Sequence, residues 1–113
     1  MLPEDRIRLQ HIVTEIQEAC SFAEGMTFEE FVCDRKTVKA IIRSIEVIGE
    51  AAARISGSTR VKHSNIPWKQ IVGMRNHLIH VYFDTDYMTV WKTVKDNLPP
   101  LLKQLEMIII DDP

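Results

Sequence analysis

Apolar residues recur three or four positions apart through most of this 113-residue chain. The longest such series lies in the middle of the sequence and consists of Val38, Ile41, Ile42, Ile45, Ile48, Ala52 and Ile55. This spacing follows the turn of an α-helix and differs from the strict alternation of a half-buried strand. The series therefore predicts a long helix with one buried face, in a chain that has no convincing strand or hairpin signal.

Capping signals set the limits of the first three predicted helices. Pro3 suits the first turn of a helix that Gly25 can end. Thr27 and Glu30 form a capping box for a short second helix, and Asp34 can cap the long third one. Glu4 and Asp5 complement the dipole at the start of the first helix, whose buried stripe is Ile12, Ile16, Cys20 and Ala23.

The second half of the chain predicts a loop and two more helices. Residues 57–65 are predicted to form the main loop, and a fourth helix should run from Pro67 to about His80. Residues 83–86 can cap a fifth helix, which Pro99-Pro100 must kink or restart. These elements predict an all-α, antiparallel bundle of four to five helices in a single domain, residues 1–113. A core this small also leads us to expect a homodimer.

The termini and cysteines point to the cytoplasm. The N-terminus has neither the basic nor the apolar region of a signal peptide, and the run Met107–Ile110 is far too short to cross a bilayer. Cys20 and Cys33 are not a CxxC pair, so we expect two reduced cysteines packed as small apolar residues. The predicted protein is cytoplasmic and has no contact with a membrane.

The charges are unevenly distributed along the chain. The formal net charge of -2 argues, as a total, against a nucleic-acid binder. Residues 51–83, however, contain no Asp or Glu and carry a formal charge of +5, which leaves -7 elsewhere. These cations are Arg54, Arg60, Lys62, Lys69 and Arg75. The segment is either a solvated stretch or an anion-binding face that could contact RNA.

The segment from Arg75 to Tyr82 is the richest in chemistry. On an ideal helix Asn76 and His80 share a face, whereas Arg75 and His80 lie about 140° apart around the axis. Arg75 and His80 therefore meet at one ligand only if the helix unwinds near His80 or a second copy completes the site. A two-fold axis near this helix would bring two Arg75 and two His80 residues into one cleft.

These residue types suit the cleavage of RNA. A histidine can transfer a proton near neutral pH, an arginine can stabilise charge on phosphoryl oxygens, and an asparagine can orient either group. The 2′-hydroxyl of RNA supplies the nucleophile, so neither a metal nor another cofactor is needed, and a cyclic phosphate is the expected product.

Three other interpretations remain open from the residues alone. The basic face could belong to a non-catalytic module that binds a nucleotide or a protein partner. Arg75 could instead pair with a carboxylate of another helix in a purely structural dimer. His77, His80 and Asp84 could bind a metal ion, although two histidines and one nearby aspartate are a weak signal.

The series Arg75-x4-His80-x-Tyr82 resembles the motif of the HepT-like branch of the HEPN superfamily. The resemblance covers nearly the whole chain, in the order and spacing that the family has. Besides the motif it rests on Phe31-Val32-Cys33-Asp34, Ile48-Gly49-Glu50-Ala51-Ala52, Ile66-Pro67-Trp68, Gly73-Met74-Arg75-Asn76, Val90-Trp91 and Asn97-Leu98-Pro99. One departure is Val81, because this position is often small in relatives.

The resemblance implies a homodimeric toxin ribonuclease with its active cleft at the dimer interface. Arg75 and His80 would be the catalytic pair, and Asn76 would support them. It also implies an antitoxin, a minimal nucleotidyltransferase of the MntA type, which transfers AMP from ATP to the motif tyrosine, here Tyr82. A phosphate-bearing group there would add negative charge and bulk where the RNA phosphate must bind.

Overall fold

The computed structural model describes the backbone of residues 1–84 and 86–113 and the side chains of residues 1–76 and 86–113. In this part of the chain every regular element is helical. The elements are α1 (Pro3–Ala23), α2 (Phe28–Cys33), α3 (Arg35–Ala53), α4 (Gly57–Lys62), α5 (Trp68–Asp84), α6 (Tyr87–Lys92), the π-helical turn η1 (Thr93–Asn97) and α7 (Leu98–Asp111). No described helix is long and apolar enough to span a membrane.

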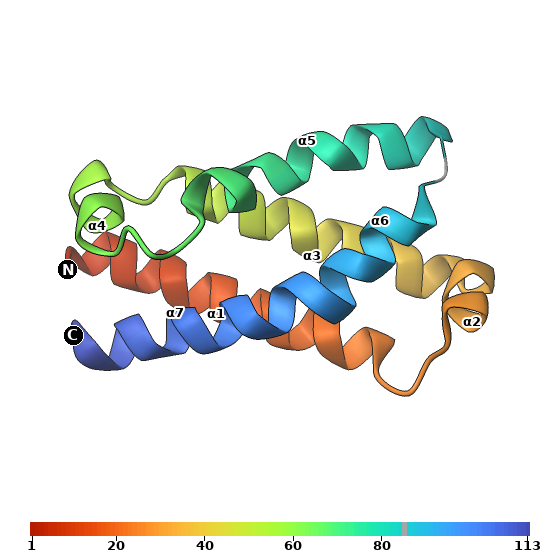
Figure 1. Cartoon of the computed structure of the whole chain (residues 1–113), viewed down its shortest axis with the longest axis horizontal. Coiled ribbons are helices and arrows are strands. Elements are labelled where there is room, and N and C mark those ends of the chain that lie inside the picture. The colour runs from red at the N-terminus through yellow and green to blue at the C-terminus, as the bar shows by residue number, and fades with distance from the viewer. Residues whose placement is uncertain (85) are drawn as a thin grey trace.

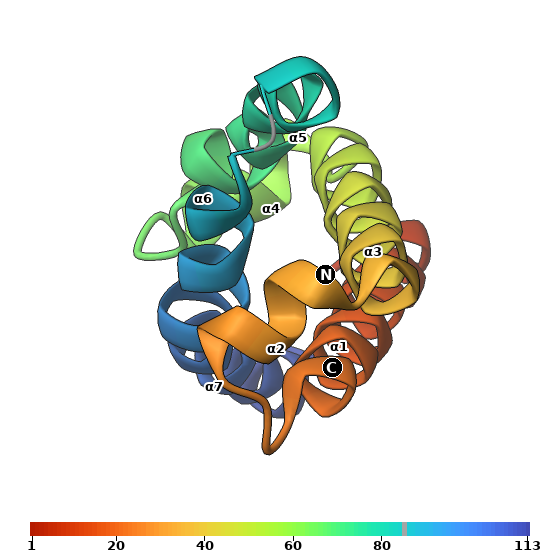
Figure 2. The same ribbon diagram turned by 90° about the vertical axis from the view of Figure 1, so that its right-hand side faces the viewer.

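Four rods run antiparallel to form the bundle (Figure 1). They are α1, α3, α5 and a composite rod in which α6, η1 and α7 follow one another. Seen from one end, α3 lies between α1 and α5, and the composite rod closes the other side (Figure 2). The prediction of an all-α antiparallel bundle is confirmed.

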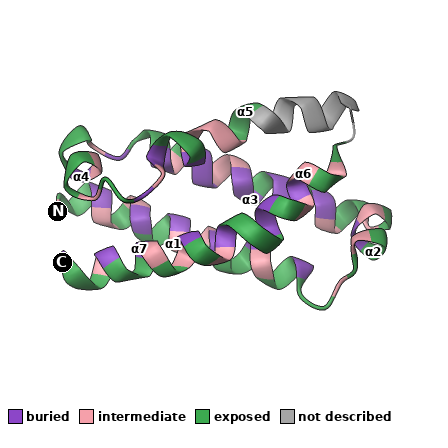
Figure 3. Cartoon of the chain, in the orientation of Figure 1, coloured by how far each residue is buried: buried purple, intermediate pink, exposed green. Residues whose placement is uncertain are grey.

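The predicted stripe of the long central helix forms the middle of the core. Val38, Ile41, Ile42, Ile45, Ile48 and Ala52 are all buried, and so is Ile55, just beyond the helix end. Buried positions of the other rods face the same interior (Figure 3). Phe31 of α2 closes one end of this core and stacks on Trp91, with ring centroids 5.1 Å apart.

The helix boundaries before α3 follow the predicted capping residues. Thr27 and Glu30 form a complete capping box, with Thr27 N 2.9 Å from Glu30 Oε1 and Glu30 N 3.1 Å from Thr27 Oγ1. Asp34 Oδ1 accepts a hydrogen bond from the N–H of Thr37 at 3.1 Å. Gly25, with φ of 76°, adopts the left-handed conformation that lets the chain turn out of α1.

The prediction of a loop over residues 57–65 is wrong for its first part, because residues 57–62 form α4. The helix begins at an N-cap, Ser56, whose hydroxyl accepts a hydrogen bond from the Thr59 N–H at 3.4 Å. Gly57 follows the third helix, as an end signal would, but here it is also the first residue of the next helix. Because glycine is a poor helix former, α4 carries only a weak helical signal in the sequence.

A buried carboxylate fixes α4 to the start of α1. Asp5 is 1% exposed, and its oxygens accept hydrogen bonds from Ser56 N at 3.0 Å and from Thr59 Oγ1 at 2.6 Å. The Ser56 hydroxyl donates a further hydrogen bond at 2.5 Å. Asp5 therefore does more than complement the dipole of α1, since it joins two segments that are about fifty residues apart in the sequence.

The two consecutive prolines explain the π-helical turn in the composite rod. Pro99 and Pro100 have no N–H, so the regular hydrogen-bond ladder cannot pass through them. In the turn before them the Leu98 N–H reaches back to the Thr93 carbonyl, one residue further than in an α-helix. In an α-helix the Val94 carbonyl would accept the Leu98 N–H. Here it accepts a hydrogen bond from the Cys20 thiol of α1, at 3.8 Å. The predicted kink is thus a π-helical turn, and the helical rod continues through it.

The ends of the chain meet α4 at Asp112. This carboxylate lies 2.8 Å from His63 Nε2, 3.0 Å from Lys62 Nζ and 3.1 Å from the amino group of Met1. The hydrogen bonds from His63, from Lys62 and from the terminal amine hold the Asp112 pKa far below its ordinary value. The cluster joins both termini to one end of the bundle.

The two cysteines have different surroundings. Both are free thiols, as expected. Cys20 is partly buried, and that burial raises its pKa despite the nearby Lys95. Cys33 is exposed at the end of α2, so the expectation that it packs as a small apolar residue is wrong. In a six-residue helix only one narrow face can be buried, and Phe31 occupies it.

Replacing Asp5 with Asn should destabilise the fold at neutral pH. Burial disfavours ionisation of the Asp5 carboxyl, but its hydrogen bonds to Ser56 and Thr59 outweigh this and lower its pKa. A carboxyl with a lowered pKa stabilises the fold above its unfolded-state pKa, and the contribution is lost as the pH falls through the folded pKa. Urea unfolding should show a loss of about 1–3 kcal/mol at pH 7 for Asp5→Asn.

The difference between the wild type and Asp5→Asn should shrink below about pH 4. Glu4→Gln is the matched control, because Glu4 is the exposed neighbour on the same turn. A loss of stability equal to that of Glu4→Gln would contradict the assigned role of Asp5.

Candidate active site

Helix α5 is continuous from Trp68 to Asp84 and therefore runs past residue 80, where the sequence predicted its end. It begins directly after Pro67, whose carbonyl accepts the Ile71 N–H at 3.0 Å. The Trp68 indole donates to the His63 carbonyl at 3.0 Å and holds the helix start against the preceding turn. Unwinding near His80 was one of two ways to bring Arg75 and His80 together, and the continuous helix excludes it. Positions 75 and 80 therefore lie about 140° apart around α5.

Arg75 and Asn76 are exposed on the middle of α5. Among the residues whose side chains are described, none forms an ion pair or hydrogen bond with either of them. Within one copy of the chain, therefore, no described carboxylate pairs with Arg75. An unpaired guanidinium on the surface is available to bind an anion.

Gly49 of α3 brings the backbone of α5 unusually close at Arg75. A Cβ atom placed on Gly49 would lie 3.3 Å from the Arg75 Cβ, 3.5 Å from the Ile71 carbonyl oxygen and 3.6 Å from the Val72 carbonyl oxygen. Gly49 is itself buried. The absence of a side chain at this position lets the two helices cross in close contact and fixes where Arg75 leaves the bundle.

The remaining predicted motif residues belong to the last turns of α5. Their backbone is helical, whereas the side chains of His77, His80 and Tyr82 lie outside the described residues. The same holds for the weak metal-site hypothesis of His77, His80 and Asp84. Where side chains are described, no three His, Cys, Asp or Glu residues are grouped so that they could hold a metal ion.

Two of the four predicted RNA contacts already have partners within the fold. Arg60 donates from Nε to the Ile55 carbonyl at 3.2 Å and from Nη2 to the Ala52 carbonyl at 2.7 Å. These bonds satisfy carbonyls at the end of α3. Lys62 pairs with Asp112 at 3.0 Å. Both residues belong to α4, which lies at the end of the bundle where α5 begins (Figure 1).

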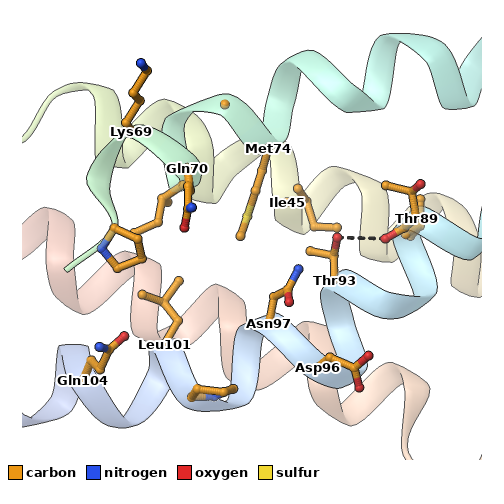
Figure 4. Close-up of a pocket in the computed structure, with 15 residues that line it drawn as sticks. Ile45, Lys69, Gln70, Met74, Thr89, Thr93, Asp96, Asn97, Leu101 and Gln104 are labelled. Atoms are coloured by element: carbon orange, nitrogen blue, oxygen red, sulfur yellow. Dashed lines mark hydrogen bonds between the residues drawn. The ribbon is translucent and has the colours of Figure 1, made fainter. Parts of the chain in front are cut away.

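The other two predicted contacts are exposed on different helices. Arg54 follows α3 and lines a shallow hollow with Arg8 and His11 of α1. Lys69 lies in the first turn of α5 and points away from the bundle (Figure 4). Arg60 and Lys69 line one hollow, whereas Arg54 lines a different one and Lys62 pairs with Asp112.

A hollow of about 920 Å³ lies beside the first half of α5. Gln70 and Met74 point into it from α5, opposite Asn97 and Leu101 of the composite rod (Figure 4). The Thr93 hydroxyl at its edge donates to the Thr89 carbonyl at 2.8 Å. Arg75 and Asn76 do not line this hollow.

Sequence reasoning missed a second group of cations. Arg35, Lys36, Lys39 and Arg43 are all exposed on the first half of α3. No Asp or Glu occurs from Arg35 to Ile45, so this stretch has a formal charge of +4. The stretch of residues 35–45 is shorter than the acid-free stretch of residues 51–83, but its charge per residue is higher. It lies among the residues outside 51–83, whose total charge is -7.

Comparison with known proteins identifies a family. The family model "Ribonuclease HepT-like" matches residues 12–108. A protein of Thermococcus cleftensis named "Probable ribonuclease HepT" is 40% identical over 100 residues, which cover 88% of this chain and 91% of that protein.

Two further relatives carry the name "Putative RNase". The protein of Caldanaerobacter subterraneus subsp. tengcongensis is 42% identical over 101 residues, which cover 89% of this chain and 90% of its own. One from Methanocaldococcus jannaschii is 42% identical over 103 residues, covering 91% and 89%. No solved structure gave a significant match.

The close crossing at Gly49 predicts opposite effects for two Gly→Ala substitutions. Alanine is the better helix former by about 1 kcal/mol, so Gly73→Ala in α5, where a Cβ would meet nothing within 4 Å, should raise the stability. At Gly49 the added methyl group must push on the Arg75 Cβ, and this crowding should cancel the gain or reverse it. Thermal unfolding of both variants measures the difference, and an equal rise in Tm for both would contradict the close crossing.

Proposed function

This chain belongs to the HepT-like ribonuclease family of the HEPN superfamily, and from this we propose that it is an endoribonuclease whose active cleft forms between two copies. The observation that carries the proposal is the continuity of α5. Because positions 75 and 80 face different directions on one helix, a single copy cannot aim both at one phosphate. A two-fold axis beside α5 would place Arg75 of one copy near His80 of the other.

Cleavage in this cleft needs only groups that RNA and two copies of the chain supply. The 2′-oxygen attacks the adjacent phosphorus while His80 takes the 2′ proton. The bond from phosphorus to the 5′-oxygen of the next nucleotide breaks, and His80, now protonated, returns the proton to that leaving oxygen. Arg75 stabilises the charge that develops on the phosphoryl oxygens, and Asn76 orients the phosphate. The products are a 2′,3′-cyclic phosphate and a 5′-hydroxyl end.

The proposed biological role is that of a toxin controlled by a nucleotidyltransferase antitoxin. The antitoxin would join the Tyr82 oxygen to the α-phosphorus of ATP and release pyrophosphate. The attached AMP would place negative charge and bulk two residues from His80, where the RNA phosphate must enter. RNA and ATP are both abundant in the cytoplasm, where we expect the protein to act.

Arg75→Ala and His80→Ala should each reduce RNA cleavage by about two orders of magnitude or more, because each removes a group that acts only as the transition state forms. Cleavage of a labelled single-stranded RNA by purified protein, with a chelator present, measures this loss. Activity that requires an added metal ion would contradict the proposed chemistry. His11→Ala is the matched control, since His11 is an exposed histidine on α1.

The same assay separates the proposal from a non-catalytic binding module. A binding module would bind the transferase or ATP tightly while the wild type leaves RNA intact. Wild-type activity in both variants would equally exclude Arg75 and His80 as the catalytic pair.

Tyr82 should be the acceptor of AMP. Incubation with ATP and a nucleotidyltransferase of the MntA type should raise the mass of the wild type by one or more AMP units and abolish RNA cleavage. Tyr82→Phe should remain unmodified and active under the same conditions. Tyr87→Phe is the control, because Tyr87 is the other tyrosine of the chain. Equal AMP adducts on Tyr82→Phe would exclude this acceptor.

A further inference from the structure

We propose that three exposed cations on the first half of α3, namely Arg35, Lys39 and Arg43, form a strip that binds the phosphate backbone of single-stranded RNA. This inference rests on the proposed ribonuclease function and names where the substrate strand leaves the cleft. We call these residues the α3 strip.

The α3 strip lies along the flank of α3 that faces α5. Gly49 marks this flank, because it touches α5 at Ile71, Val72 and Arg75. Stepping back from Gly49 by three and four residues in turn gives Glu46, Ile42, Lys39 and Arg35, which is the spacing of one face of a helix. Arg43 lies one turn after Lys39 but about 120° around the axis from Gly49, so the strip turns from the α5 flank toward solvent.

The antiparallel course of the two helices sets where the α3 strip ends. Helix α3 crosses α5 at Gly49, in the second half of α3 and the first half of α5. From this crossing the first half of α3 and the second half of α5 run toward the same end of the bundle and diverge (Figures 1 and 2). This second half carries positions 80 and 82, so the strip lies at the same end of the bundle as the turns of α5 that the proposed function assigns to catalysis and control.

The side chains of the α3 strip are free to bind an anion. All three are exposed. Within the described side chains, Arg35 and Lys39 form no ion pair or hydrogen bond. Arg43 Nη1 lies 3.4 Å from Glu46 Oε2, and the Arg43 side chain is 69% exposed, so this surface pair holds it weakly.

The position of the cations does not serve the stability of α3 itself. Helices α1 and α2 have acidic residues in their first turns, where the helix dipole favours negative charge. The first turn of α3 has no acid and instead carries Arg35 and Lys36, which the dipole disfavours. The N-cap Asp34 supplies a carboxylate near Lys36, and Arg35 has no such partner among the described side chains.

The length of the α3 strip favours a polyanion over a single phosphate. Arg35, Lys39 and Arg43 follow at intervals of four residues, so their Cα atoms rise by about 6 Å from one to the next. Three cations spread along about 12 Å of helix cannot converge on one phosphate group. They can contact successive phosphates of one strand, which is the sequence-independent contact that makes RNA binding depend on salt.

Binding of an uncleavable RNA tests the α3 strip. We would measure the dissociation constant of a 2′-O-methyl RNA oligonucleotide over a range of salt concentrations for the wild type and for Lys39→Gln/Arg43→Gln. Each lost phosphate contact should lower the slope of log K against log salt by about 0.7, so the double variant should lose about 1.4. In the cleavage assay KM should rise several-fold with kcat unchanged.

The control Lys92→Gln/Lys103→Gln makes the same change in net charge with two exposed lysines of α6 and α7. It should keep the wild-type slope and KM. Equal slopes for the α3 double variant and the wild type, with intact cleavage, would overturn the α3 strip but leave the proposed function standing. A wild type that neither binds nor cleaves RNA would overturn the proposed function and the α3 strip together. If sedimentation shows that only the assembly state of the α3 variant changes, the strip binds protein and the RNA assignment is wrong.

Discussion

The close crossing of α3 and α5 at Gly49 is the constraint on which the rest of the molecule depends. The apolar stripe of α3 is the middle of the core, and Gly49 lies on the side of that stripe that meets α5. With no Cβ at this position, α5 approaches close enough for Arg75 to leave the bundle at a fixed place while its side chain stays exposed. The same crossing determines that the first half of α3, with its cations, lies at the same end of the bundle as the second half of α5. One glycine therefore relates the core, the proposed catalytic arginine and the α3 strip.

The long helices could be predicted from the sequence because their signals are local. The stripe of α3, the capping box at Thr27 and the cap at Asp34 each depend on residues within one or two turns, and all three are confirmed. Helix α4 could not be predicted in this way. Its start depends on Asp5, a residue about fifty positions earlier whose carboxylate becomes a partner of Ser56 and Thr59 only in the folded chain.

The number of cations could be counted from the sequence, but the sequence does not show which of them pair within the fold and which stay exposed. Arg60 and Lys62 belong to the acid-free segment, yet one satisfies carbonyls at the end of α3 and the other pairs with Asp112. The net charge of the acidic remainder concealed Arg35, Lys39 and Arg43, because the acids of residues 1–34 outweigh them in any total. A cation becomes a candidate for RNA binding when it is exposed, unpaired and close to the reacting groups. Among the described side chains, Arg35 and Lys39 on the first turns of α3 are exposed and unpaired at the end of the bundle where α5 ends.

The account depends most on an active cleft that takes Arg75 from one copy and His80 from the other. Mixing Arg75→Ala and His80→Ala subunits tests this directly, because each variant is inactive alone. Random exchange would make about half of the dimers mixed. Each mixed dimer has one complete Arg75 and His80 set, whereas a wild-type dimer has two. The mixture should therefore recover about a quarter of the wild-type cleavage rate. A mixture that exchanges subunits and stays inactive would show that both residues must come from the same copy, which contradicts the account.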